Sequence, residues 1–145
     1  MKRLVVALLP LWLGGCTLFI RTNPVPHLEA EAVPAERLLA YQDKKAGYLP
    51  LIVTRDEGYL GSACYIGLEV NGTLAARLDL SETATFYAPP GELTLSAVGD
   101  SAGSGLCFLS WQKVIEHYTL QPGQPNLYRI SLGAYRRPRV VPTPE

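Results

Sequence analysis

Residues 63–80 decide the fold class of this chain, and they read ACYIGLEVNGTLAARLDL. In the first half, apolar residues occupy every second position, which is the period of a half-buried strand: Cys64, Ile66, Leu68 and Val70. The same period resumes after Asn71-Gly72. Two alternating segments joined by Asn-Gly predict a β-hairpin.

The register of this hairpin follows from matching the apolar faces of its strands. A two-residue loop at Asn71-Gly72 would place Val70 opposite Thr73 and mix the core and solvent faces. A three-residue loop with a left-handed bulge at Gly72 places Glu69 opposite Thr73 and keeps the apolar residues together. We therefore expect the bulged turn.

A second hairpin is expected at residues 89–91, whose sequence Pro-Pro-Gly suits a type II turn. Apolar residues alternate on both sides of it. Pairing Ala88 with Leu93 places Phe86 opposite Leu95, so an even-length loop fits here.

Seven or eight short strands separated by turn signals predict an all-β protein, an antiparallel β-sandwich of immunoglobulin-like or transthyretin-like type. A short helix is expected at Pro34–Gln42, because proline suits the first helical turn. The expected strands are Leu51–Arg55, Ala63–Val70, Thr73–Leu80, Thr83–Ala88, Glu92–Val98, Leu106–Leu120 (as one strand or two) and Leu127–Leu132.

The N-terminus has the pattern of a secretory signal. Two basic residues precede an apolar run at Leu4–Leu13, and small residues precede Cys16. The run is too short to span a bilayer, which takes about 20 residues. The stretch Leu13-Gly14-Gly15-Cys16 resembles the lipobox of bacterial lipoproteins. The resemblance implies that Cys16 carries lipid after cleavage, and Thr17 at the next position favours the outer membrane, facing the periplasm.

These features divide the chain into four parts. Residues 1–15 are expected to be a lipoprotein signal peptide, 16–33 the lipidated cysteine and a proline-containing tether, 34–134 the sandwich with its leading helix, and 135–145 a proline-rich tail. Cleavage removes Lys2 and Arg3 but none of the 13 acidic residues, which leaves the mature chain slightly acidic. Nucleic acid is therefore not an expected partner.

The three cysteines fit an exported protein once Cys16 carries lipid. Cys64 and Cys107 then remain as an even pair in an oxidising compartment, where a disulfide between them is expected. The alternative is two buried free thiols that behave as small apolar side chains.

No catalytic constellation is found in the sequence, and no metal site or cofactor is expected. The two histidines, His27 and His117, are 90 positions apart. The charge cluster Arg55-Asp56-Glu57 could bind a ligand, but a turn with Arg55 paired to a carboxylate such as Asp79 or Glu82 is the preferred interpretation. Arg129 is expected to form a surface ion pair.

Three tyrosines are candidates for a contact surface, since amphipathic rings are favoured at interfaces. Tyr59, Tyr65 and Tyr87 occupy expected loop or outward positions. They would form such a surface if the fold brings them together, and scattered exposed tyrosines would be the ordinary alternative.

Several motifs together resemble small proteobacterial lipoproteins of uncharacterised function: Arg55-Asp56-x-Gly58, Gly61-x-x-Cys64, Asn71-Gly72, Pro89-Pro90-Gly91-Glu92, Cys107 and Tyr128-Arg129-Ile130. The stretch from Val70 to the Pro-Pro-Gly turn also resembles PEGA-type surface modules, which are β-sandwiches. The resemblance implies an envelope β-domain without a catalytic site.

We therefore expect a non-enzymatic envelope lipoprotein, a binding or assembly module held at a membrane by its lipid and directed at an envelope protein. The alternative is a periplasmic inhibitor that blocks a hydrolase with the loop at 99–105 or 59–62. A hydrolase would need a deep pocket lined by His117, Asp56 or Glu57.

Overall fold

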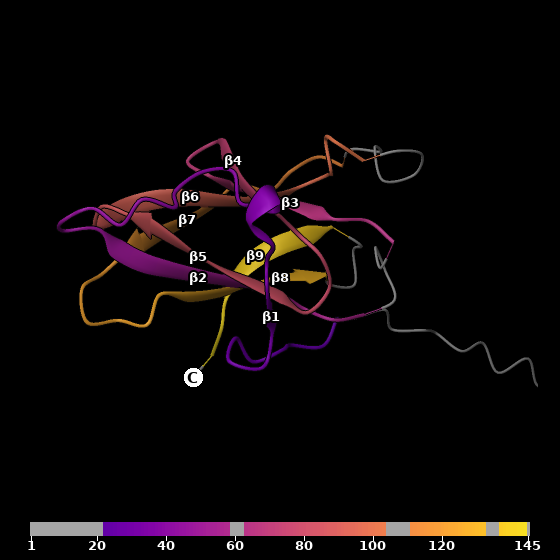
Figure 1. The fold of residues 1–145 in the computed structure, drawn as a ribbon, viewed down its shortest axis with the longest axis horizontal. Coiled ribbons are helices and arrows are strands. Elements are labelled where there is room, and N and C mark those ends of the chain that lie inside the picture. The colour runs from indigo at the N-terminus through magenta and orange to yellow at the C-terminus, as the bar shows by residue number, and fades with distance from the viewer. Residues whose placement is uncertain (1–21, 59–62, 104–110, 133–136, 145) are drawn as a thin grey trace, which may run out of the picture.

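Two β-sheets pack face to face in the computed structural model, which describes residues 22–58, 63–103, 111–132 and 137–144 (Figure 1). The all-β, sandwich-like fold expected from the sequence is confirmed. The strands are β1 (Glu31–Ala32), β2 (Leu49–Arg55), β3 (Ile66–Val70), β4 (Thr73–Leu78), β5 (Glu82–Ala88), β6 (Gly91–Val98), β7 (Glu116–Leu120), β8 (Leu127–Leu132) and β9 (Pro138–Pro142).

The five-stranded sheet has the order β1-β5-β2-β8-β9, and the four-stranded sheet has the order β4-β3-β6-β7. Most neighbouring strands are antiparallel, as expected, but β1·β5 and β2·β8 are parallel pairs. The described residues contain no helix that is both long and apolar enough to cross a membrane.

One hydrophobic core lies between the sheets and contains residues of both. Alternate positions of β5 and β8 point into it, which is why the period of two predicted these strands. β8 shows this most clearly, since its bounds are those expected and Tyr128, Ile130 and Leu132 are buried. Phe86 of β5 and Leu95 of β6 are completely buried on opposite sides of this core. The expected strand Leu106–Leu120 is, in its described part, a strand only at Glu116–Leu120.

The turn between β3 and β4 differs from the expected one. Asn71 and Gly72 have φ values of 49° and 76°, so both central residues are left-handed as in a type I′ turn. Val70 is paired with Thr73, and Glu69 with Leu74. The three-residue bulged turn is therefore wrong, although the left-handed Gly72 is found.

Keeping the apolar residues of β3 and β4 on one face of the sheet requires one extra residue, and this residue lies within β4 instead of the turn. The register shifts so that Glu69 pairs with Leu74 and Leu68 with Ala76, leaving Ala75 without an opposite residue. The Ala75 carbonyl accepts hydrogen bonds from the amides of Leu39 and Ala40. Such a β-bulge bends the strand, and here it turns Leu74 to the outer face of the sheet.

The expected hairpin at Pro89-Pro90-Gly91 is also wrong. Ala88 pairs with Leu49 of β2, and Leu93 pairs with Tyr118 of β7. The turn joins two strands in different sheets. Alternation identified which residues face the core, but strands on opposite sides of one core share that pattern.

The expected helix at Pro34–Gln42 reduces to a single 3-10 turn, η1 (Ala35–Arg37). Leu38 then forms a bridge with Ala76, beside the amides that bond to Ala75. A two-turn helix has little stability of its own, and the open edge of β4 offers these backbone groups partners instead.

The sandwich extends past both boundaries expected from the sequence. Within the expected tether, β1 pairs with β5, and Val33 belongs to the core. Within the expected tail, β9 pairs with β8, and Val140 is 0% exposed. The prolines that suggested an extended tail are tolerated because β9 lies at the edge of its sheet.

Truncation of β9 side chains tests whether this segment belongs to the core. We expect Val140→Ala to lower the free energy of unfolding by about 2 kcal/mol, because it removes buried methyl groups and leaves a cavity. Val141→Ala, at a half-buried neighbouring position, is the matched control and should cost less than half as much. Equal losses in denaturant titrations would show that β9 is not packed as described.

Candidate functional site

The residues singled out in the sequence fall into two groups. Cys16, Cys107 and Tyr59 lie outside the described residues, so lipidation of Cys16 and pairing of Cys64 with Cys107 stay predictions. Cys64 and Tyr65 are half-buried immediately before β3. Tyr87 is half-buried on β5.

Tyr65 and Tyr87 do not form one surface. The Tyr65 ring lies against Arg37, whose guanidinium pairs with Glu82 at the start of β5. Tyr87 is five residues further along that strand, about 17 Å away at the rise of a β-strand. The tyrosine contact surface is therefore not supported by the two members that the structure describes.

Tyr65 instead belongs to an arginine–tyrosine cluster at one end of the sandwich. Two guanidinium groups lie over its ring, with the Cζ of Arg37 at 4.4 Å and that of Arg77 at 5.0 Å from its centroid. Arg37 pairs with Glu82 at 2.5 Å, and Arg77 with Asp100 at 2.7 Å. Each arginine thus binds a carboxylate and also contacts the aromatic ring, and these two interactions fix its position.

Arg55, expected to pair with a carboxylate in a turn, is completely buried beneath this cluster. Its Nη1 donates to the carbonyl oxygens of Cys64 at 2.7 Å and Leu78 at 2.8 Å. Burial lowers the pKa of Arg55 to about 10, although the charges of Asp79 and Glu82 act in the opposite direction. Arg55 therefore remains a cation at neutral pH.

Asp56, which follows Arg55, is buried rather than exposed in a turn. Its Oδ2 accepts from the Thr22 hydroxyl at 2.8 Å and from Nη1 of Arg129 at 2.5 Å. Arg129 therefore has a buried partner, and the expected surface ion pair is wrong. Burial raises the pKa of the Asp56 carboxyl above its usual value, while the Thr22 hydroxyl and the Arg129 charge oppose this shift.

The histidines do not meet in the structure. His117 is exposed on β7 opposite Thr94, whereas His27 is half-buried in the turn that precedes β1. Within the described part of the chain, no three His, Cys, Asp or Glu residues form a group that could hold a metal ion.

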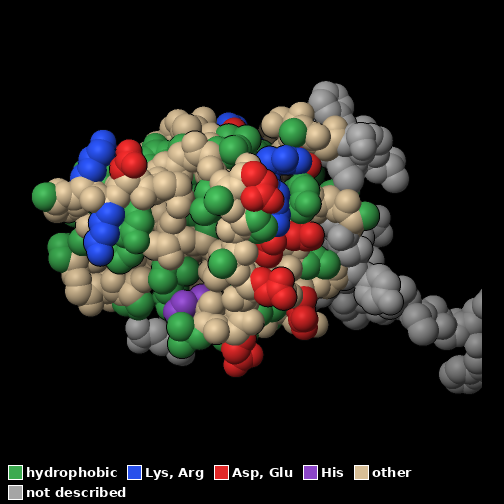
Figure 2. All heavy atoms as spheres, viewed as in Figure 1, with side chains coloured by type: hydrophobic (Ala, Val, Ile, Leu, Met, Phe, Trp, Pro, Cys, Tyr) green, Lys and Arg blue, Asp and Glu red, His purple; other side chains and the backbone are tan. Residues whose placement is uncertain are grey.

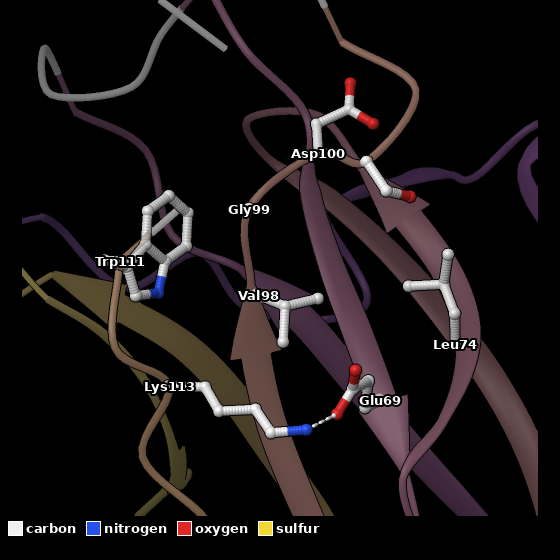
Figure 3. A pocket seen from close by; sticks show the side chains of 8 residues that line it. Glu69, Leu74, Val98, Gly99, Asp100, Trp111 and Lys113 are labelled. Atoms are coloured by element: carbon white, nitrogen blue, oxygen red, sulfur yellow. Dashed lines mark hydrogen bonds and ion pairs between the residues drawn. The ribbon is translucent and has the colours of Figure 1, made fainter. Parts of the chain in front are cut away.

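A hollow of about 420 Å³ opens on the outer face of the four-stranded sheet (Figure 3). Leu74 of β4, Val98 of β6 and Trp111 supply its apolar surface. Lys113 and Glu69 form an ion pair of 2.6 Å at one side of it. Its size lies within the range of small-ligand sites.

Local features of the two central strands build the floor of this hollow. The β4 bulge places Leu74 on the outer face, opposite Glu69. A Cβ at Gly67 would lie 2.7 Å from Cγ2 of Val98 and 2.9 Å from Cδ1 of Leu74. Glycine at this position therefore lets two apolar side chains close over the sheet. Trp111 is held beside them because its indole nitrogen donates to the Ala97 carbonyl at 3.3 Å.

Asp100 connects the hollow to the arginine–tyrosine cluster. Its carboxylate binds Arg77 and also accepts from the Ala102 amide at 3.1 Å, which orders the turn that follows β6. The hollow's charged groups are therefore engaged with each other or with this cluster. It offers an apolar contact surface with a polar margin.

Charges are mixed on the face of the molecule seen in Figure 2. Basic groups adjoin acidic ones near η1 and at the left end, where the loop at 42–48 carries the exposed residues Asp43, Lys44 and Lys45. Acidic groups continue from η1 towards β1. No single-sign field covers the part of this face that the structure describes.

Sequence reasoning missed three residues that matter here. The register with a bulge at Gly72 pairs Leu74 with Leu68 and so places Leu74 in the core, whereas the bulge lies within β4 and Leu74 pairs with Glu69. Asp100 was assigned to a glycine-rich loop, and Thr22 to the tether. The run Asp-x-Ala-Gly after a strand is a turn signal that could have pointed to Asp100, whereas no local pattern distinguishes Thr22.

Comparison with protein-family models, with curated proteins and with solved structures found no match for this chain.

The Asp100–Arg77 ion pair makes a pH-dependent contribution to stability. Arg77 lowers the pKa of Asp100 below its usual 3.8, so the contribution is complete above that pH and disappears as the pH falls through the lowered pKa. We expect Asp100→Asn to lower the free energy of unfolding by about 1–2 kcal/mol at pH 7.

Denaturant titrations at pH 7 and pH 2.5 measure this contribution, and the difference from wild type should shrink at the lower pH. Asp43→Asn, at an exposed loop position, should match wild type at both. A difference for Asp100→Asn that persists unchanged at pH 2.5 would rule out the charged pair as its source.

Proposed function

We propose that this chain is a bacterial envelope lipoprotein, anchored through Cys16 and facing the periplasm, and that its β-sandwich is a non-catalytic binding or assembly module. The outer membrane is the proposed location, on the strength of Thr17. We also propose the Cys64–Cys107 disulfide and an immunoglobulin-like or transthyretin-like type for the sandwich, which the strand number and two-layer arrangement support.

The proposal of a binding function depends on the hollow lined by Leu74, Val98 and Trp111. Tryptophan is enriched at the centres of protein interfaces, and here its ring lies beside two aliphatic side chains on a sheet face. The Glu69–Lys113 pair supplies a polar margin. An apolar centre with a polar rim is the composition of a protein contact site.

The inhibitor alternative is favoured by one observation. The turn at 99–103 is ordered by Asp100, which binds Arg77 and the Ala102 amide, and the Gly103 amide donates to the Asp100 carbonyl at 2.9 Å. An ordered loop loses little conformational entropy when it enters an active-site cleft. The same turn borders the hollow, so a hydrolase is one class of partner for this surface.

The anchor is tested with Cys16→Ser in the full chain. We expect the wild-type protein to float with membranes and to carry the mass of a diacylglyceryl group, and the variant to be recovered in the soluble periplasmic fraction without that mass. Cys16 is the proposed lipid attachment point, and a single buried acyl chain already binds membranes reversibly. A variant that still floats would contradict the anchor.

The contact surface is tested with Leu74→Ser. This substitution should weaken capture of an envelope partner by about tenfold or more, because central interface residues contribute about 2 kcal/mol when truncated. Leu28→Ser is the matched control, since Leu28 is 87% exposed and lies in the turn before β1. Equal capture by both variants, at equal thermal stability, would remove the hollow as the binding site.

A further inference from the structure

The first described residue of the chain is locked into the sandwich. Thr22 is 8% exposed. Its hydroxyl donates to Oδ2 of Asp56 at 2.8 Å and accepts from the Leu132 amide at 3.0 Å. Its own amide donates to the Leu132 carbonyl at 3.3 Å. Thr22 is therefore joined to the ends of both β2 and β8.

We call these contacts of Thr22 the Thr22 lock, and the neighbouring backbone adds further hydrogen bonds to it. Asn23 and Glu57 exchange two amide-to-carbonyl hydrogen bonds of 2.8 and 3.0 Å. A Cβ at Gly58 would lie 3.1 Å from Cγ2 of Thr22, so glycine allows the close approach. On the other side of Thr22, Arg129 binds the same carboxylate oxygen of Asp56.

The lock leaves a short connection to the proposed anchor. Cys16 precedes Thr22 by six positions, and six residues span at most about 20 Å when fully extended. A lipid on Cys16 therefore keeps the Thr22 position within about 20 Å of the membrane surface. The expected tether of residues 16–33 could have separated the domain from the membrane by about 60 Å.

The strand register shows which parts of the molecule share the end that carries Thr22. β2 and β8 finish there. β6 finishes on the same side, because Arg55 at the end of β2 binds the Cys64 carbonyl just before β3, and Gly67 of β3 pairs with Val98 at the end of β6. The opposite end carries the starts of β2, β6 and β8 and the loops at 42–48, 89–90 and 121–126. In Figure 1 the loops at 42–48 and 121–126 lie at the left.

We propose that the Thr22 lock fixes the orientation of the sandwich, so that the Thr22 end is the surface that faces the lipid bilayer. This inference rests on the proposed lipidation of Cys16. The partner of the Thr22 end is the headgroup layer of the anchoring membrane. The opposite end, about 25 Å away along the length of β6, is presented to the periplasm.

Energy transfer in vesicles tests this orientation. The full-length, lipidated protein is reconstituted into phosphatidylethanolamine–phosphatidylglycerol vesicles that contain an acceptor on the lipid headgroups. A donor is attached through a non-natural amino acid at Ala102, on the Thr22 end, or at Gln124, on the opposite end; both positions are exposed. We expect severalfold stronger transfer from position 102.

Two variants remove the constraint in different ways. A 20-residue Gly/Ser spacer between residues 20 and 21 adds a root-mean-square reach of about 25 Å without touching the lock, and it should bring the two transfer signals close together. Thr22→Val replaces the hydroxyl with a methyl group in a side chain of the same shape, and it should also reduce the difference between the two transfer signals. Thr22→Ser retains the hydroxyl and should match wild type.

The outcomes separate this inference from the function on which it rests. Protein that fails to float and lacks the lipid mass overturns both the anchor and the orientation. Lipidated, floating protein with equal transfer from positions 102 and 124 overturns the orientation alone. A spacer variant that keeps the full wild-type difference also overturns it, because the short connection would then not be its cause.

Discussion

The buried guanidinium of Arg55 connects the two sheets at the end of the core, and much of the surrounding structure depends on it. Arg55 belongs to β2 of the five-stranded sheet, but its Nη1 donates to the carbonyls of Cys64, just before β3, and of Leu78, the last residue of β4, in the other sheet. A buried cation is costly unless it is well hydrogen-bonded and lies near opposite charge. With its pKa lowered to about 10 by burial, Arg55 is charged at neutral pH. The segments that contain these carbonyls must therefore converge on it.

Two carboxylates at this end of the sandwich, Glu82 and Asp100, fix elements outside the sheets. Glu82 holds Arg37 of η1, so the 3-10 turn is fixed against the start of β5. Asp100 holds Arg77 and thereby orders the turn after β6. Because that turn borders the hollow, the shape of the proposed contact surface is set by charge pairing as well as by the apolar floor. Loss of any one partner would leave a charge with little water around it, which links the stability of this end to the geometry of the site.

The sequence predicted the strands better than it predicted their neighbours, for a physical reason. Alternation with a period of two indicates which side chains face a core. It identified β8 and the inward residues of β5 and β6 correctly. Both sheets face the same core, so alternation could not show that the strands flanking Pro89-Pro90 lie in different sheets. Alternation showed that an extra residue was needed but not where it lies, since the sequence placed the bulge at Gly72 and the structure has it within β4. Its position in β4 decides that Leu74 lines the hollow. Thr22 and Asp56 meet across 34 positions, a contact that no local pattern encodes.

The orientation and the hollow together restrict the kind of partner that could be bound. Under the proposed anchoring, the Thr22 end stays within about 20 Å of the bilayer. The hollow includes Val98 and Asp100, which belong to the same end of the sandwich, and it opens on the face of a sheet rather than at the tip. A partner that contacts Trp111 must then approach from the side, alongside the membrane. A protein that is itself embedded in or bound to that membrane satisfies this geometry, because both molecules are confined to one layer and meet with their lateral surfaces.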